Sequence, residues 1–159
     1  MSSIDAVQAY FDKNGFTGEI LTFDVSSATV PLAAQALGCE EARIAKTLSY
    51  LVNGQPVLVV AAGDARVDNR KFKDAFGAKA RMLTPEQAEE LVGHRVGGVC
   101  PFAVKPGVQV YLDTSLQRFD TVFPACGSAN SAVEMTIPEL ERLSHSLGWV
   151  EVCKLPDSV

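Results

Sequence analysis

The stretch TLSYLVNGQPVLVVAAG, residues 47–63, places the strongest constraint on how this chain can fold. Two apolar runs rich in β-forming residues flank the dipeptide Asn53-Gly54. Asn-Gly is a preferred sequence of two-residue hairpin turns, because both central positions of such a turn need a positive φ. The pattern therefore predicts an antiparallel hairpin, and hence a sheet that is at least partly antiparallel.

Helical and strand-like patterns alternate along the rest of the chain. Helices are expected over residues 3–14, 29–38, 40–46, 67–77, 84–93 and 136–147, and strands over 18–25, 80–83, 97–104, 108–116, 121–126, 131–136 and 149–153. Asp68, Thr84 and Thr136 stand where N-caps are needed, and a proline closely follows each threonine. We expect one α/β domain over residues 1–159, with helices packed on a mixed sheet.

Composition excludes several classes of protein. Hydrophobic residues make up 47% of the 159 residues and charged residues 21%, as in a soluble globular protein. No apolar run approaches the roughly 20 residues that span a bilayer. The first residues include Asp5 and Asp12 and no basic leader, so we expect a cytoplasmic protein. The four cysteines show no C-x-x-C spacing, so reduced thiols and no metal are expected.

Charge is distributed unevenly. The net charge is −5, which gives no global attraction for nucleic acid. Residues 64–81 nevertheless hold six basic and three acidic side chains. This segment is either a solvated helix face of mixed charge or a surface that meets phosphates. The candidate tRNA-binding residues in it are Arg66, Arg70, Lys71 and Lys73.

Four motifs occur in order along the chain. They are A-x-x-L-G-x-x-x-x-x-I-A-K-T-L (34–48), GDARVDNRKFK (63–73), GHRVGGVCPF (93–102) and the loop within TVFPACGSANSAVEMT (121–136). Together they resemble the YbaK family of aminoacyl-tRNA editing domains, and the chain is similar to the editing domain inserted in bacterial prolyl-tRNA synthetase. The resemblance implies a compact domain with a largely antiparallel, barrel-like sheet surrounded by helices. It also implies a free-standing deacylase that hydrolyses mischarged tRNA without a cofactor.

Two bends of small residues suit this chemistry. An aminoacyl ester is already activated, so its hydrolysis needs a positioned water and donors for the developing oxyanion, which main-chain amides can supply. Glycine lets the main chain approach a ligand closely. The candidate substrate-binding residues in the bends are Gly98, Val99, Cys100, Gly127, Ser128, Ala129 and Asn130, with Phe23, Val30 and Phe102 as candidate pocket walls. Each bend taken singly is equally consistent with a tight turn, and each wall residue with core packing.

Lys46 is the candidate catalytic residue. By spacing alone it is a lysine near a helix C-terminus, where its charge is favourable. The resemblance instead implies an active-site cation that holds a phosphate or the ester oxygen, with a ribose hydroxyl of the terminal adenosine helping to activate water. The implied partners are the acceptor end of an aminoacyl-tRNA and a prolyl-tRNA synthetase.

The resemblance leaves the substrate open. Editing domains of the prolyl-tRNA synthetase type carry a Gly-x-x-x-Pro loop, whereas here Ser131 follows Gly127 at the proline position. Alanine, cysteine and other small amino acids on tRNA-Pro therefore all remain candidates. Two other functions are alternatives: a thiol hydrolase that uses Cys100 with His94, and a module that binds tRNA or a small ligand without catalysis.

Overall fold

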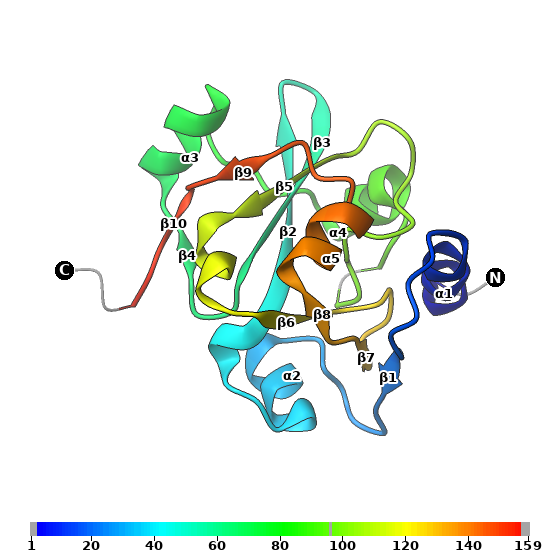
Figure 1. Cartoon of the computed structure of the whole chain (residues 1–159). Helices are drawn as coiled ribbons and strands as arrows, with labels where there is room; N and C mark the ends of the chain where they lie inside the picture. The colour runs from blue at the N-terminus through cyan, green and yellow to red at the C-terminus, as the bar shows by residue number, and fades with distance from the viewer. Residues whose placement is uncertain (1–2, 96, 157–159) are drawn as a thin grey trace.

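A long hairpin, β2 (Ile44–Val52) and β3 (Gln55–Ala62), forms the centre of the computed structural model, which describes residues 3–95 and 97–156 (Figure 1). The two strands pair antiparallel from Ala45 with Ala62 to Val52 with Gln55. Asn53 and Gly54 form the turn with φ angles of 49° and 81°. The predicted hairpin is therefore confirmed.

The hairpin is extended on both sides into a six-stranded sheet. The order is β8-β6-β2-β3-β5-β9, with β5 (Gln109–Asp113), β6 (Thr121–Pro124), β8 (Met135–Thr136) and β9 (Trp149–Val150). Two small ladders join β1 (Leu21–Thr22) to β7 (Ser131–Ala132) and β4 (Arg66–Val67) to β10 (Cys153–Lys154). The predicted mixed α/β fold is confirmed, and the sheet curls into a half-barrel.

Parallel pairing is more extensive than expected. The β6 strand runs parallel to β2, β5 runs parallel to β3, and β9 runs parallel to β5. Parallel neighbours require long crossover connections. The segment between β3 and β5 supplies one, and it contains α3 (Asn69–Phe76), α4 (Pro85–Gln87) and a π-helical turn (Ala88–Val92).

The helices begin at the predicted caps. Asp68 accepts a hydrogen bond from the Lys71 amide at the start of α3, and Thr84 and Thr136 form capping boxes that start α4 and α5 (Ile137–Leu143). The other helices are α1 (Ser3–Lys13) and α2 (Val30–Leu37). No helix of the described residues is long and apolar enough to cross a membrane.

Several predicted boundaries were wrong. Residues 97–104 form turns and bends instead of a strand, with positive φ at Gly97 and Ala103. The predicted helix at 40–46 is a 3-10 turn (Glu41–Arg43), so Lys46 lies within β2. The strand expected at 18–25 shortens to β1, the strand expected at 149–153 divides into β9 and β10, and the last helix ends at Leu143.

The fold brings the two glycine bends into contact. A Cβ on Gly98 would lie 2.6 Å from both the Gly127 carbonyl carbon and the Ser128 amide nitrogen. Behind the first bend, Phe102 is fully buried, and its ring lies 4.9 Å from that of Phe11 in α1. Main-chain contact at Gly98 therefore fixes the distance between segments that lie about thirty residues apart in the sequence.

We expect Gly98→Ala to lower the free energy of unfolding by about 1–3 kcal/mol, because the added methyl group must push two main-chain segments apart. Urea denaturation measures the change. Gly107→Ala is the comparison for backbone strain alone, because its Cβ meets nothing within 4 Å while its φ of +90° is unfavourable for alanine. A Gly98→Ala midpoint equal to that of the wild type would contradict the contact.

Candidate functional site

A cavity of about 350 Å³ opens where one edge of β2 lacks a neighbouring strand. At one end of this edge, β6 pairs with Ile44 and Ala45. At the other end, the Leu51 amide donates to the Arg81 carbonyl over 2.8 Å, and the Leu83 amide donates to the Ser49 carbonyl over 3.0 Å. Residues 46–48 lie between these two pairings, and Lys46 and Thr47 line the cavity.

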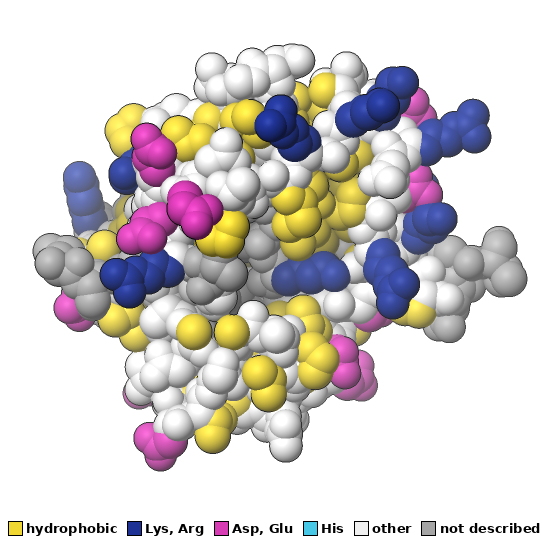
Figure 2. All heavy atoms as spheres, turned by 180° about the vertical axis from the view of Figure 1, so that it is seen from behind, with side chains coloured by type: hydrophobic (Ala, Val, Ile, Leu, Met, Phe, Trp, Pro, Cys, Tyr) yellow, Lys and Arg dark blue, Asp and Glu magenta, His cyan; other side chains and the backbone are white. Residues whose placement is uncertain are grey.

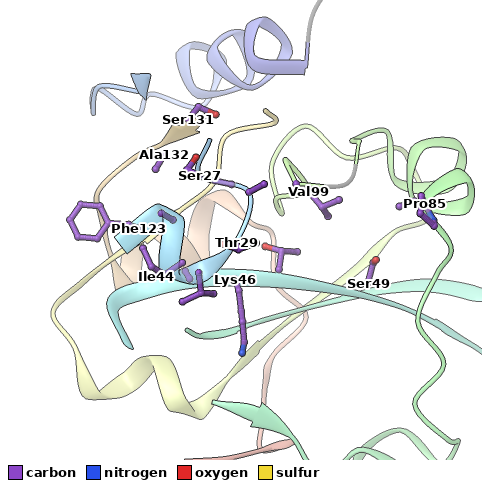
Figure 3. A pocket seen from close by; sticks show the side chains of 18 of the residues that line it. Ser27, Thr29, Ile44, Lys46, Ser49, Pro85, Val99, Phe123, Ser131 and Ala132 are labelled. Carbon is purple, nitrogen blue, oxygen red and sulfur yellow. The ribbon is translucent and has the colours of Figure 1, made fainter. Parts of the chain in front are cut away.

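Segments distant in sequence enclose this space. Figure 3 shows Phe123, Ser131 and Ala132 toward one end of the pocket, Ser49 and Pro85 toward the other, and Val99 between them. Seen from behind, the molecule is hollowed near the middle of the face (Figure 2). The cavity is large enough for a small amino acid and part of what carries it.

The cavity wall is mostly apolar and carries neutral hydroxyl groups. The hydroxyl-bearing residues that line it are Ser27, Thr29, Thr47, Ser49 and Ser131. Among the described lining residues, Lys46 is the one with a charged side chain, and none is a carboxylate. In the same part of the chain, no group of three or more His, Cys, Asp or Glu residues is arranged to hold a metal ion.

Lys46 lines the cavity, but its side-chain amine is directed elsewhere. The Nζ atom donates to the carbonyl oxygens of Ala65 and, over 3.4 Å, Gly63. In Figure 3 the side chain points away from Ser27, Val99 and Ser131. Burial lowers the pKa of this amine, and the nearby Cys153 and Asp64 partly oppose that shift.

The two predicted bends border the cavity through their flanking residues. Gly97 and Val99 line it on one side, and Ala125 and Ser131 line it on the other. Gly98, Gly127, Ser128, Ala129 and Asn130 are not among the lining residues. The Gly98 amide is engaged, because it donates to the Arg95 carbonyl over 3.0 Å.

The second bend is held by the segment that precedes α2. The Ser27 amide donates to the Ala129 carbonyl, and the Phe23 amide donates to the Asn130 carbonyl over 2.9 Å. The Ser128 hydroxyl donates to the Ser131 hydroxyl over 2.7 Å. Among the described residues, the amides of 127–130 take part in no main-chain hydrogen bond, so they are not committed to another main-chain group.

The predicted wall residues lie in three different places. Val30 lines the cavity. Phe23 is half-buried beside Asn130 but does not line the cavity. Cys100 and Phe102 are fully buried in the hydrophobic core, behind the first bend, where they support the wall rather than form it.

His94 and Cys100 are brought together, but both are sealed from solvent. Their Nε2 and Sγ atoms lie 3.6 Å apart, and Nε2 also lies 2.8 Å from the Phe102 carbonyl. Burial raises the pKa of the Cys100 thiol to about 12 and lowers the pKa of His94. A buried neutral thiol is a poor nucleophile, so this pair is arranged as part of the core.

The basic segment lies beside the cavity and only part of it is free. Lys and Arg side chains gather on the side of the hollowed face that carries α3 and β4 (Figure 2). Arg66, Arg70 and Lys73 are exposed. Lys71 instead bonds to Glu151 over 3.3 Å and to the Cys153 carbonyl over 3.2 Å.

Sequence reasoning missed most of the lining residues, including four with polar or long side chains. Thr47, Ser49 and Met82 were not selected, and Ser131 was noted only as a departure from a family pattern. One signal in the sequence could have found two of them. Side chains alternate between the two faces of a strand, so Ala45, Thr47 and Ser49 must share a face. Nothing in the sequence indicated which edge of that strand lacks a partner.

Known proteins resemble this chain over most of its length. The model of the aminoacyl-tRNA editing domain family matches residues 25–143. A Bacillus subtilis protein named "Uncharacterized protein YwhH" is 50% identical over 153 residues, which cover 96% of this chain and 98% of that protein. The proline--tRNA ligase of Halalkalibacterium halodurans is 32% identical over 104 residues, which are 65% of this chain and 18% of the ligase.

Two solved structures share the whole fold. The hypothetical protein APE2540 superposes with a TM-score of 0.84 and 30% identity, covering 94% of this chain and 99% of that one. A candidate trans-editing enzyme for prolyl tRNA synthetase superposes with a TM-score of 0.88 and 28% identity, covering 97% and 98%. The family model spans most of the chain and the fold is shared over at least 94% of it, so this chain belongs to the family of aminoacyl-tRNA editing domains.

Proposed function

We propose that this protein is a free-standing deacylase that hydrolyses the ester of a tRNA carrying the wrong small amino acid. The observation that carries the proposal is the cavity at the open edge of β2, which is small, uncharged apart from Lys46 and bordered by two glycine bends in contact. Such a space admits a small aminoacyl group and surrounds it with main-chain and hydroxyl groups. Membership of the editing-domain family supports the same activity.

In the proposed reaction, water attacks the ester carbonyl and the protein mainly positions the reactants. The 127–130 bend does not itself line the cavity but adjoins Ser131, which does, and its amides, which are not used in main-chain pairing, are the proposed donors to the oxyanion at the rim of the cavity. A ribose hydroxyl of the terminal adenosine helps to activate the water. Holding water and ester in a reactive geometry supplies much of the rate gain.

In this proposal, Lys46 binds the acceptor end of the tRNA. An ammonium group has three donors, and two of them face the carbonyls of Gly63 and Ala65. The third is available to a phosphate or to the ester oxygen. The side chain is partly exposed, so a phosphate can reach the amine as it stands, whereas contact with the ester oxygen requires the amine to turn toward the cavity.

Steric exclusion would set the range of substrates. A cavity of about 350 Å³ rejects large side chains, whereas one methylene more or less changes binding by only about 1–3 kcal/mol. Alanine or cysteine on tRNA-Pro are the proposed substrates, and a prolyl-tRNA synthetase is the proposed partner. Because aminoacyl-tRNA is made and used in the cytoplasm, the proposal places the protein there.

A non-catalytic binding module is the second candidate. It is favoured by one observation: the Lys46 amine is engaged with main-chain carbonyls and points away from the cavity. Release of amino acid from a panel of mischarged tRNAs separates the two functions. Binding to the panel without release would establish the module.

Lys46→Ala should lower kcat/KM for the best substrate of that panel by about 10- to 100-fold, because a hydrogen bond from a charged group is lost. Lys13→Ala, which removes an exposed lysine in α1, is the matched control and should leave the rate unchanged. Equal rates for the wild type and both variants would remove Lys46 from the mechanism.

Cys100→Ala should retain most of the wild-type deacylation rate, because the thiol is fully buried and its pKa is raised to about 12. The measurement is release of labelled amino acid under single-turnover conditions. A thiol hydrolase would instead lose its activity with this substitution, and that outcome would overturn the proposed water attack.

The paired change Arg70→Glu and Lys73→Glu should weaken tRNA binding and reduce its dependence on salt, because exposed cations near the cavity release counterions from phosphates. Filter binding at several salt concentrations measures both effects. Lys13→Glu, in α1, is the control. Identical salt slopes for the paired variant and the wild type would exclude this surface from tRNA binding.

A further inference from the structure

Thr47 is the residue at the centre of the open edge of β2. In a strand, the main-chain groups of alternate residues point to the same edge. The Ser49 carbonyl and the Leu51 amide point to the edge covered by residues 81–83. The amide and carbonyl of Thr47 therefore point to this edge too, where the pairing with β6 ends at Ala45 and, within the described residues, Thr47 makes no other main-chain hydrogen bond.

The Thr47 side chain is also without a partner. Its Oγ1 atom is buried and makes no hydrogen bond within the described part of the chain. Three other lining hydroxyls are engaged: Thr29 accepts from the Leu32 amide, Ser27 donates to the Ala129 carbonyl, and Ser131 bonds to Ser128. A buried hydroxyl without a partner is costly, and a ligand that supplies one removes that cost.

The α-ammonium group of an aminoacyl ester needs acceptors. Among the described residues that line the cavity there is no carboxylate, so neutral oxygens must hold this cation. The Thr47 carbonyl and hydroxyl can both accept from it. The hydroxyl oxygen is buried in its present position. In the proposed complex, rotation about χ1 brings it to another staggered position, beside the cavity that Thr47 lines.

The charge of Lys46 does not oppose a cation at Thr47, because the two side chains lie on opposite faces of β2. Adjacent side chains in a strand point to opposite faces. The Lys46 amine accordingly contacts the carbonyls of Gly63 and Ala65, while Thr47 shares a face with Ala45 and Ser49. A second cation bound at Thr47 is thereby kept away from the lysine charge.

We propose that Thr47 binds the α-ammonium group of the aminoacyl substrate through its main-chain carbonyl and its hydroxyl. This inference rests on the proposed function for the identity of the ligand. It adds that Thr47 recognises the α-ammonium group, which all amino acids share. The shape of the cavity then selects among the side chains of the amino acids.

The test uses two stable analogues in which an amide replaces the ester: 3′-alanylamino-3′-deoxyadenosine and 3′-propionylamino-3′-deoxyadenosine. They differ only in the α-amino group, which is largely protonated at pH 6.5. Isothermal titration calorimetry at this pH should show that the wild type binds the alanyl analogue about tenfold or more tightly than the propionyl analogue. Thr47→Val should lose most of this preference, and Thr47→Ser should keep it. Thr22→Val, the same change at an exposed position of β1, is the control.

Several outcomes would overturn the inference. These are equal binding of both analogues by the wild type, no binding of either, or an equal loss for both in a Thr47→Val protein with wild-type thermal stability. If binding of a third analogue, which carries serine, is the one that Thr47→Val weakens, the hydroxyl recognises the substrate side chain and the inference is also overturned. Binding does not require cleavage, so a preference that depends on Thr47 without ester hydrolysis would support the inference and reject the deacylase.

Discussion

The interrupted edge of β2 is the feature on which the site depends. Along its other edge β2 is paired with β3 from Ala45 to Val52, which fixes the strand in the core. Unpaired main-chain groups at a strand edge need partners. Here β6 and residues 81–83 cover the two ends, and the part between them opens into a cavity of about 350 Å³. The polar groups that pairing leaves unused are therefore concentrated where a ligand can reach them.

The same strand separates two kinds of polar group by simple alternation. The Lys46 amine contacts the carbonyls of Gly63 and Ala65, whereas Thr47 lines the cavity and has a buried hydroxyl without a partner in the described part of the chain. A phosphate and an ammonium group are both present at the end of an aminoacyl-tRNA. Lys46 thus presents a cation that can bind the phosphate, and Thr47 presents neutral acceptors that can bind the ammonium group. The lysine and the bound ammonium group are kept apart because adjacent side chains lie on opposite faces of the strand.

Close packing behind the cavity keeps its walls in place. Gly98 touches the main chain of Gly127 and Ser128, and the buried His94, Cys100 and Phe102 fill the space behind the first bend. In a close-packed interior, small volume changes move neighbouring segments. The Cys100 thiol and the His94 imidazole therefore support the wall of the cavity by packing. Because both are buried, neither can react with a substrate.

The sequence by itself determined the central hairpin, the capped helix starts and the mixed α/β class, because Asn53-Gly54, Asp68, Thr84 and Thr136 act through contacts with residues close to them in the chain. With the family resemblance it also pointed to Lys46 and to the two bends as candidates. Only the tertiary structure decided that residues 97–104 are not a strand, that Cys100 and Phe102 lie in the core, and that Thr47 faces an open edge. These facts depend on which segments lie beside β2 and behind the bends, and such long-range neighbours leave no local pattern in the sequence.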